Sequence, residues 1–254
     1  MASVEAIVAC LDRELNVEAF EDASHNGLQV QNSGLVQKVC CGVDASMSFF
    51  EAAAQEGADL LICHHGISWG HSLCRLTELQ YRRVKFLMQH DMALYAAHLP
   101  LDAHRVYGNN ACIANALGLR NVHPFGSYHG QSIGFAGRLG KAQPIEAFVK
   151  RVQGVMGRPD ALQVMEFGAA TVKTVAVVSG GAADMVAEAG QKGIDVLVTG
   201  EPVLAAYSMA QEYGVHVVFG GHYATETFGV RALGQLVARQ FDVETSFIDM
   251  NVPY

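Results

Sequence analysis

Two short segments of this chain repeat the same arrangement of a histidine and an acid. Residues 98–102 read H-x₃-D, residues 222–226 read H-x₃-E, and the pair at 64–65 is a third histidine element. Imidazole nitrogen and carboxylate oxygen together suit Zn, Mn, Fe or Co. The four histidines and two carboxylates of these elements make a set suited to more than one divalent metal ion from that group. They are His64, His65, His98, Asp102, His222 and Glu226.

All three elements follow runs of apolar residues with strand character. The runs cover residues 60–63, 92–96 and 215–219. In open α/β sheets, ligands gather at the carboxyl ends of the strands. We therefore expect the three elements to converge on one site, although they lie far apart in the sequence.

The roles of these side chains follow from their chemistry. Adjacent histidines at a strand end point in divergent directions, so His64 and His65 would serve two different ions. A carboxylate has two oxygens to share, and Glu226 or Asp102 could bridge the ions. An imidazole both takes and gives a proton near neutral pH, so His98, if it binds no metal, is the best proton shuttle.

One glycine-rich turn is a weaker candidate for ligand binding. Ser179-Gly180-Gly181 joins an expected strand to an expected helix. Its backbone N–H groups could hold a phosphate. A tight turn that needs positive φ explains the same residues equally well.

An internal repeat organises the chain. The segment from Val36 to Leu61 matches the segment from Val172 to Leu197 without gaps, at an offset of 136 residues. Both read strand, turn, helix, Gly-x-Asp, strand. A further helix follows each copy, at 78–89 and at 202–212, and then a third strand that leads into the H-x₃-acid pattern. The recurrence favours duplication of one α/β lobe over chance similarity.

The predicted fold is therefore α/β, with two duplicated lobes related by a pseudo-twofold axis. The first lobe covers residues 1–125 and carries His64-His65 and the 98–102 pattern. The second covers residues 126–254 and carries the 222–226 pattern, with a C-terminal strand that could return to the first lobe. The metal site is expected between the lobes, at the carboxyl ends of the strands.

Composition excludes several classes of function. Half of the 254 residues are hydrophobic and 17% are charged, which indicates a globular chain. The formal net charge is −8, without a lysine or arginine cluster, so binding of nucleic acid or of a membrane through a basic face is not expected.

The sequence also indicates a compartment. Residues 1–16 read as an amphipathic helix capped by Ser3, not as a signal peptide. The six cysteines lack framework spacing, which favours free thiols in a reducing environment. These features together predict a cytoplasmic protein.

Short motifs spread over nearly the whole chain resemble a known family. The chain is similar to the Nif-three-like dinuclear metal-centre proteins in their short form, many of which are called GTP cyclohydrolase 1 type 2. The motifs that carry the resemblance are Asn26-Gly27-Leu28-Gln29-Val30, Gly42-Val43-Asp44-Ala45-Ser46, His64-His65-Gly66, His98-Leu99-Pro100-Leu101-Asp102, Gly108-Asn109-Asn110, Thr199-Gly200-Glu201 and Gly221-His222-Tyr223-Ala224-Thr225-Glu226.

The resemblance implies a two-metal site held by the same residues that the pattern selects. It assigns His64, His65, Asp102, His222 and Glu226 as ligands, and leaves His98 in the first shell or just outside it. It also implies a ring-shaped homohexamer whose metal sites face an internal cavity. The substrate it implies is GTP, but similarity of fold or site does not transfer a substrate.

Three functions fit these observations. The first, which we rank highest, is a metal-dependent hydrolase that opens the ring of a purine nucleotide at C8. The second uses the same metals on another small molecule, for example as a phosphoesterase. The third is a metal-handling or regulatory interaction protein without catalysis, which the same ligands would serve equally well.

Overall fold

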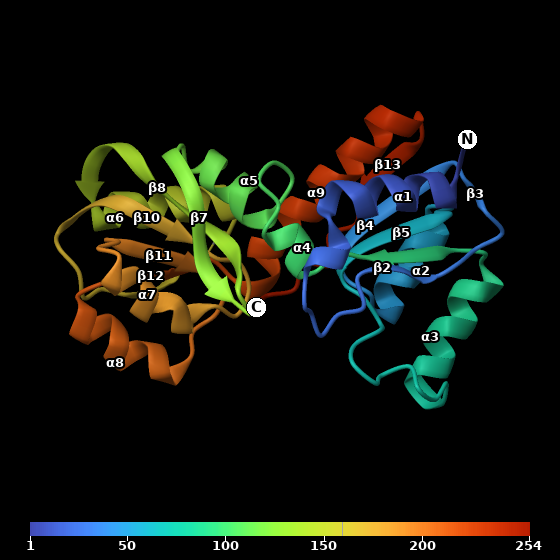
Figure 1. The fold of residues 1–254 in the computed structure, drawn as a ribbon, viewed down its shortest axis with the longest axis horizontal. Helices are drawn as coiled ribbons and strands as arrows, with labels where there is room; N and C mark the ends of the chain where they lie inside the picture. The colour runs from blue at the N-terminus through green and yellow to red at the C-terminus, as the bar shows by residue number, and fades with distance from the viewer. Residues whose placement is uncertain (159) are drawn as a thin grey trace. The chain divides into compact units, whose positions relative to one another are not determined.

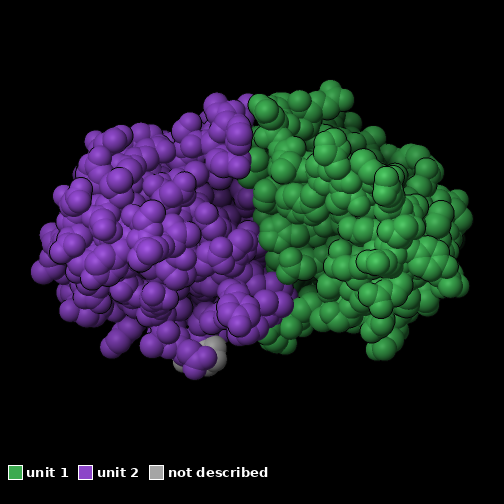
Figure 2. Space-filling model, turned by 90° about the horizontal axis from the view of Figure 1, so that it is seen from below, with its two compact units in different colours: residues 1–101, 229–251 green, residues 102–228, 252–254 purple. Residues whose placement is uncertain are grey.

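The computed structural model describes residues 1–158 and 160–254 as a mixed α/β protein with several sheets (Figure 1), which confirms the predicted fold class. By packing, the chain divides into two compact units, coloured separately in Figure 2. Unit 1 consists of residues 1–101 and 229–251, and unit 2 of residues 102–228 and 252–254.

This division differs from the predicted boundary between residues 125 and 126. Strand β7 (Arg120–Tyr128) pairs antiparallel with β8 (Gln131–Pro144), so the segment after residue 101 packs within unit 2. Strand β13 (Glu244–Phe247) pairs parallel with β4 (Lys38–Asp44), which places the later part of the chain in unit 1.

Unit 1 is built on a five-stranded sheet with the order β13-β4-β5-β6-β2. The strands β4, β5 and β6 are parallel, and β2 runs antiparallel at one edge. A small ladder, β1 with β3, lies outside this sheet. The remaining elements of unit 1 are β1 (Ala2–Ser3), α1 (Val4–Leu15), η1 (Val17–Ala19), β2 (Gly27–Val30), β3 (Leu35–Val36), α2 (Met47–Gln55), β5 (Leu60–His65), α3 (Glu78–Gln89) and β6 (Ala93–Ala96).

Two helices of unit 1 begin at serine caps. The Ser3 hydroxyl accepts the Ala6 N–H at 3.1 Å at the start of α1, as the sequence predicts. The Ser46 hydroxyl accepts the Phe49 N–H at 3.3 Å at the start of α2. Such caps satisfy donors that a helix leaves unpaired. Both helices bury their apolar side chains at helical spacing.

Unit 2 is built on a six-stranded sheet with the order β7-β8-β10-β11-β12-β9. Strands β10, β11 and β12 are parallel, and β9 pairs antiparallel with β12. The core between the sheet and α5 and α6 is almost entirely aliphatic. The other elements of unit 2 are α5 (Asn109–Ala116), α6 (Ile145–Met156), β9 (Gln163–Met165), β10 (Thr171–Val177), η2 (Ala183–Met185), α7 (Val186–Gln191), β11 (Val196–Thr199), α8 (Leu204–Tyr213) and β12 (His216–Phe219).

The two copies of the repeat have the same strand order. In each unit three consecutive parallel strands are neighbours, and an antiparallel strand pairs with the third. The Gly-x-Asp segments also make the same contacts. The Asp59 carboxylate accepts the N–H groups of residues 37 and 38 at 2.7 and 2.9 Å, and Asp195 accepts those of residues 173 and 174 at 2.8 and 2.7 Å. These shared contacts support duplication of one lobe, and the pseudo-twofold relation stays a prediction.

The acids of the two H-x₃-acid patterns lie on helices, whereas the sequence analysis placed the patterns at the ends of strands. Residues 99–102 form the short helix α4 (Leu99–Asp102), and α9 (His222–Phe241) starts at the histidine. The sequence analysis did not place the start of α9 at His222. Residues four apart on a helix share a face, which is why this spacing brings His222 and Glu226 together.

Two general observations concern the cysteines and the helices of the chain. All six cysteines are free, and four of them are buried. Among the described residues, none of the helices combines the length and apolar character needed to cross a membrane.

Candidate metal site

Three histidines of unit 1 form a compact cluster at the carboxyl ends of two adjacent parallel strands. His64 and His65 end β5, and His98 follows β6 by two residues. One ring nitrogen from each histidine lies within 4.8 Å of the others. His64 is fully buried, and the other two side chains are 22% exposed. His64, His65 and His98 therefore lie together within unit 1, and convergence of all three elements on one site stays a prediction.

Each histidine of this cluster directs Nδ1 at an oxygen acceptor. The partners are the Ala97 carbonyl for His64, at 2.8 Å, and the carboxylates of Asp44 for His65, at 2.8 Å, and of Asp22 for His98, at 2.9 Å. Carbonyls and carboxylates only accept, so Nδ1 carries the hydrogen in each ring. In a neutral imidazole the lone pair is then on Nε2, which is the form that binds a metal.

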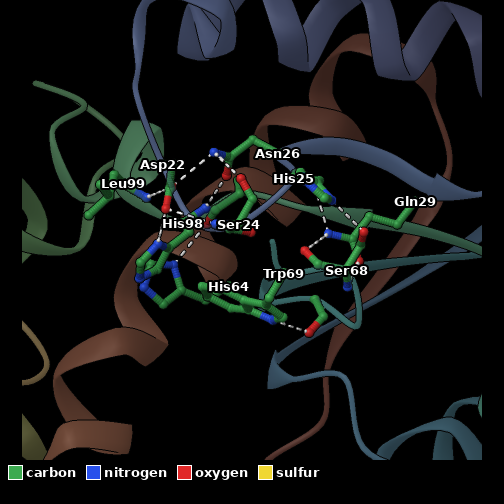
Figure 3. A network of polar contacts seen from close by, with 12 residues as sticks. Asp22, Ser24, His25, Asn26, Gln29, His64, Ser68, Trp69, His98 and Leu99 are labelled. Carbon is green, nitrogen blue, oxygen red and sulfur yellow. Dashed lines mark hydrogen bonds and ion pairs between the residues drawn. The ribbon is translucent and has the colours of Figure 1, made fainter. Parts of the chain in front are cut away.

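Asp22 is the centre of the polar network around His98 (Figure 3). Besides His98, its carboxylate accepts the Ser24 N–H at 3.0 Å, the Asn26 side-chain amide at 2.9 Å and the Leu99 N–H at 3.1 Å. Burial by itself raises the pKa of Asp22, but the hydrogen bonds, led by that of His98, lower it to about 2. The sequence analysis did not select Asp22, which lies between elements and has no distinguishing spacing.

Replacing Asp22 by asparagine is expected to destabilise the protein by about 2 kcal/mol at pH 7, as a depressed carboxyl pKa implies. The lowered pKa stabilises the folded state above about pH 4, and this contribution is lost as the pH falls through about 2. Urea unfolding at pH 7 and at pH 3 measures it, with the exposed Glu21→Gln as control. A difference from the native protein that stays constant between these pH values would contradict this role of Asp22.

In unit 2, His222 at the start of α9 lies between two carboxylates, one on the same helix and one in the loop after β11. His222 Nε2 lies 3.1 Å from Glu226 Oε1, and its Nδ1 lies 3.2 Å from Glu201 Oε2. The hydrogen bond to Glu226, supported by Glu201 and opposed by burial, raises the pKa of His222 to about 9. Glu226 is buried and Glu201 is exposed. A cation is therefore stabilised at this position, whether it is a proton on His222 or a metal ion.

A glycine leaves the space that Glu226 occupies. Gly180 has φ +66°, and a Cβ built on it would lie 2.5 Å from Glu226 Oε1. The Gly180 N–H donates to the Thr225 hydroxyl at 3.0 Å, and the Ser179 N–H donates to the Asn110 side-chain oxygen at 2.6 Å. These amides are used within the protein, so the turn supports the carboxylate, and the phosphate-binding alternative has no support.

Asp102 is buried in unit 2 and tightly oriented. Its Oδ1 accepts the Asn109 side-chain amide at 2.9 Å and the Ser179 hydroxyl at 2.9 Å. Both lone pairs of Oδ1 are thereby engaged, so this carboxylate would hold a metal through Oδ2. Such an oriented, monodentate carboxylate suits a ligand of a single ion.

Comparison with known proteins gives the family. A family model described as Duf34/NIF3 (NGG1p interacting factor 3) matches residues 2–253. The chain belongs to this family. This membership confirms the resemblance seen in the sequence motifs.

Individual proteins are similar to this NIF3-family chain over nearly their whole length. A Deinococcus radiodurans protein named "GTP cyclohydrolase 1 type 2 homolog" is 42% identical over 245 residues, which cover 96% of this chain and 92% of that relative. The solved structure of the protein ybgI, described as of unknown function, has a TM-score of 0.90, 32% identity and full coverage of both chains. TTHA1606 from Thermus thermophilus has a TM-score of 0.89 and 35% identity, with 99% of this chain and 100% of that chain covered.

The single tryptophan of this NIF3-family chain lies beside the histidine cluster. The Trp69 ring centroid is 5.0 Å from that of His98 and 5.9 Å from that of His65. Its indole N–H donates to the Gly66 carbonyl at 2.7 Å, which fixes the ring. The fluorescence of Trp69 is therefore expected to change when a metal ion binds to the histidine cluster.

Proposed function

We propose that the chain is a hydrolase that uses two divalent metal ions to open the ring of a purine nucleotide. One observation carries the proposal: three histidines of unit 1 hold Nδ1 on acceptors, which leaves the Nε2 lone pairs suited to a metal, and one ring nitrogen from each lies within 4.8 Å of the others. The name of the close relatives points to GTP as the substrate.

In this proposal the metal ligands are His64, His65, Asp102, His222 and Glu226. Glu226 is the proposed bridge, because its carboxylate is buried and already lies 3.1 Å from His222 Nε2. When bound, a metal pair polarises the substrate and lowers the pKa of water. The ions are Zn, Mn, Fe or Co.

His98 is the proposed carrier of protons in the reaction. The Asp22 carboxylate holds its Nδ1–H at 2.9 Å and fixes the ring orientation. The His98 backbone N–H, held at 2.7 Å by the Asn26 side chain, fixes the chain at the same place. A histidine held in one tautomer by a carboxylate can accept a proton at Nε2 and return it to a leaving nitrogen.

Self-association into a homohexameric ring is part of the same proposal. Apolar side chains are exposed along α8, where Leu204 is 93% exposed and Tyr207 is 50% exposed. A contiguous patch of exposed apolar side chains often marks a protein–protein contact, whereas a single exposed apolar side chain does not. Sedimentation equilibrium measures the mass, and a monomer at micromolar concentration would contradict the ring.

Metal content followed by turnover tests the function. The purified protein is expected to hold about two ions per chain by elemental mass spectrometry, and His65→Ala is expected to hold fewer. The exposed His123→Ala is the matched control. The loaded protein should then remove the C8 proton signal of GTP in NMR spectra. Two bound ions without change in GTP or in a mixture of metabolites would instead indicate a metal-handling protein.

A further inference from the structure

A pocket of about 360 Å³ opens in unit 2 beside the start of α9. Its volume lies in the range of sites for small molecules. The wall combines apolar surface from Leu162, Pro202 and Phe219 with polar groups. Among the described lining residues, Arg158 and Glu201 are the charged ones. The remaining wall includes the end of the chain, at residues 253–254.

This pocket adjoins the metal ligands of unit 2. Glu201 lines it and lies 3.2 Å from His222 Nδ1. Gly221, also in the lining, directly precedes His222 in the sequence. The end of a bound molecule that lies against Glu201 would therefore be next to His222.

Arg158 lines the pocket and is held by the backbone, so that its guanidinium would lose little freedom on binding an anion. Its Nη2 donates to the Pro253 carbonyl at 3.0 Å. A Cβ at Gly221 would lie 2.9 Å from its Nη1, so the glycine leaves room for the guanidinium. A guanidinium has five N–H donors, and a fixed one binds the oxygens of a phosphate in a fork.

We propose that this pocket is the nucleotide subsite of the protein, with Arg158 as the residue that binds a phosphate. The ring of the nucleotide then lies on the apolar wall toward Glu201, the side that adjoins His222. This inference rests on the proposed function for its choice of a nucleotide, and it adds the residue that selects a phosphorylated substrate over its nucleoside.

Binding to the metal-free protein tests the subsite without any turnover. After dialysis against EDTA, GTP and guanosine are titrated by calorimetry into the native protein, Arg158→Gln and Arg138→Gln. Glutamine keeps a donor for the Pro253 carbonyl, and Arg138 is an exposed arginine of β8 outside the pocket lining. Thermal unfolding verifies that the three proteins are equally folded.

GTP is expected to bind the native protein and Arg138→Gln equally, and Arg158→Gln about 10- to 100-fold more weakly. Guanosine binding should not depend on residue 158. Equal GTP affinity in native protein and Arg158→Gln, or no GTP binding at all, would overturn the subsite.

The two proposals fail in different ways. If Arg158-dependent GTP binding is present but the metal-loaded protein leaves GTP intact, the subsite stands and the hydrolase is rejected. If GTP is hydrolysed with the same KM in Arg158→Gln, the hydrolase stands and the subsite is rejected.

Discussion

Glu226→Gln is expected to lose at least one of two metal ions while the fold survives. Two divalent cations in close proximity repel each other strongly unless an anionic ligand lies between them. Glutamine keeps the shape of the buried side chain beside Gly180 but removes its charge. The metal content should therefore fall from about two ions per chain to about one or fewer. Elemental analysis measures the loss, and circular dichroism verifies the fold.

A milder variant separates a bridging ligand from a simple one. In Asp102→Asn the side-chain oxygen can still accept the hydrogen bonds of Asn109 and Ser179. We expect this variant to bind one metal ion more weakly and to bind the other unchanged. Full occupancy in Glu226→Gln, with unchanged activity, would show that Glu226 is not the bridge.

His98→Asn is expected to lower kcat by about 10²- to 10⁴-fold, the usual contribution of a proton-transferring group. Both metal ions should remain, because the proposed ligands are unchanged. Asparagine can still donate a hydrogen bond to Asp22, so the local structure is preserved. The measurement is kcat for GTP at saturating metal, with metal content determined on the same sample.

Metal content decides between the two roles that the sequence leaves open for His98. Loss of an ion in His98→Asn would make it a sixth ligand. Quenching of Trp69 fluorescence by added Co²⁺ gives an independent measurement, because its ring lies beside those of His65 and His98. Unchanged kcat together with unchanged metal content would leave His98 without a part in the reaction.

Much of the fold could be predicted because the βαβ pattern is local. The helix expected at residues 78–89 has the bounds of α3, and the apolar run at residues 60–63 lies within β5, since a helical apolar period and a short apolar run define them. The sequence analysis did not predict strands β2 and β7. Their own patterns are short or irregular, and they become strands through hydrogen bonding to β6 and β8. The start of α9 was also missed. Its Tyr223 N–H finds an acceptor in the Tyr254 carbonyl, far along the chain.

In the candidate site, too, the sequence pattern predicts some residues, and contacts between segments far apart in the sequence determine the others. Residue type and spacing selected the histidines and acids, because a metal requires those donors. The acceptors that orient them could not be selected in this way. Asp22 has its role because the segment before β2 reaches the end of β6, and Glu201 because a loop after β11 reaches the start of α9. Tertiary structure alone creates these contacts.

Unit 1 is made of two segments that lie on either side of residues 102–228 in the sequence, and this order affects folding during synthesis. A ribosome completes residues 102–228 before it makes β13 and the later part of α9, which the sheet of unit 1 needs. Unit 2 can therefore fold while unit 1, although begun first, still lacks the partner of β4. Until then the edge of β4 is exposed and able to pair with another chain. The early part of the protein thus depends on its last-made strand, and truncation near the C-terminus should cause aggregation of the first unit.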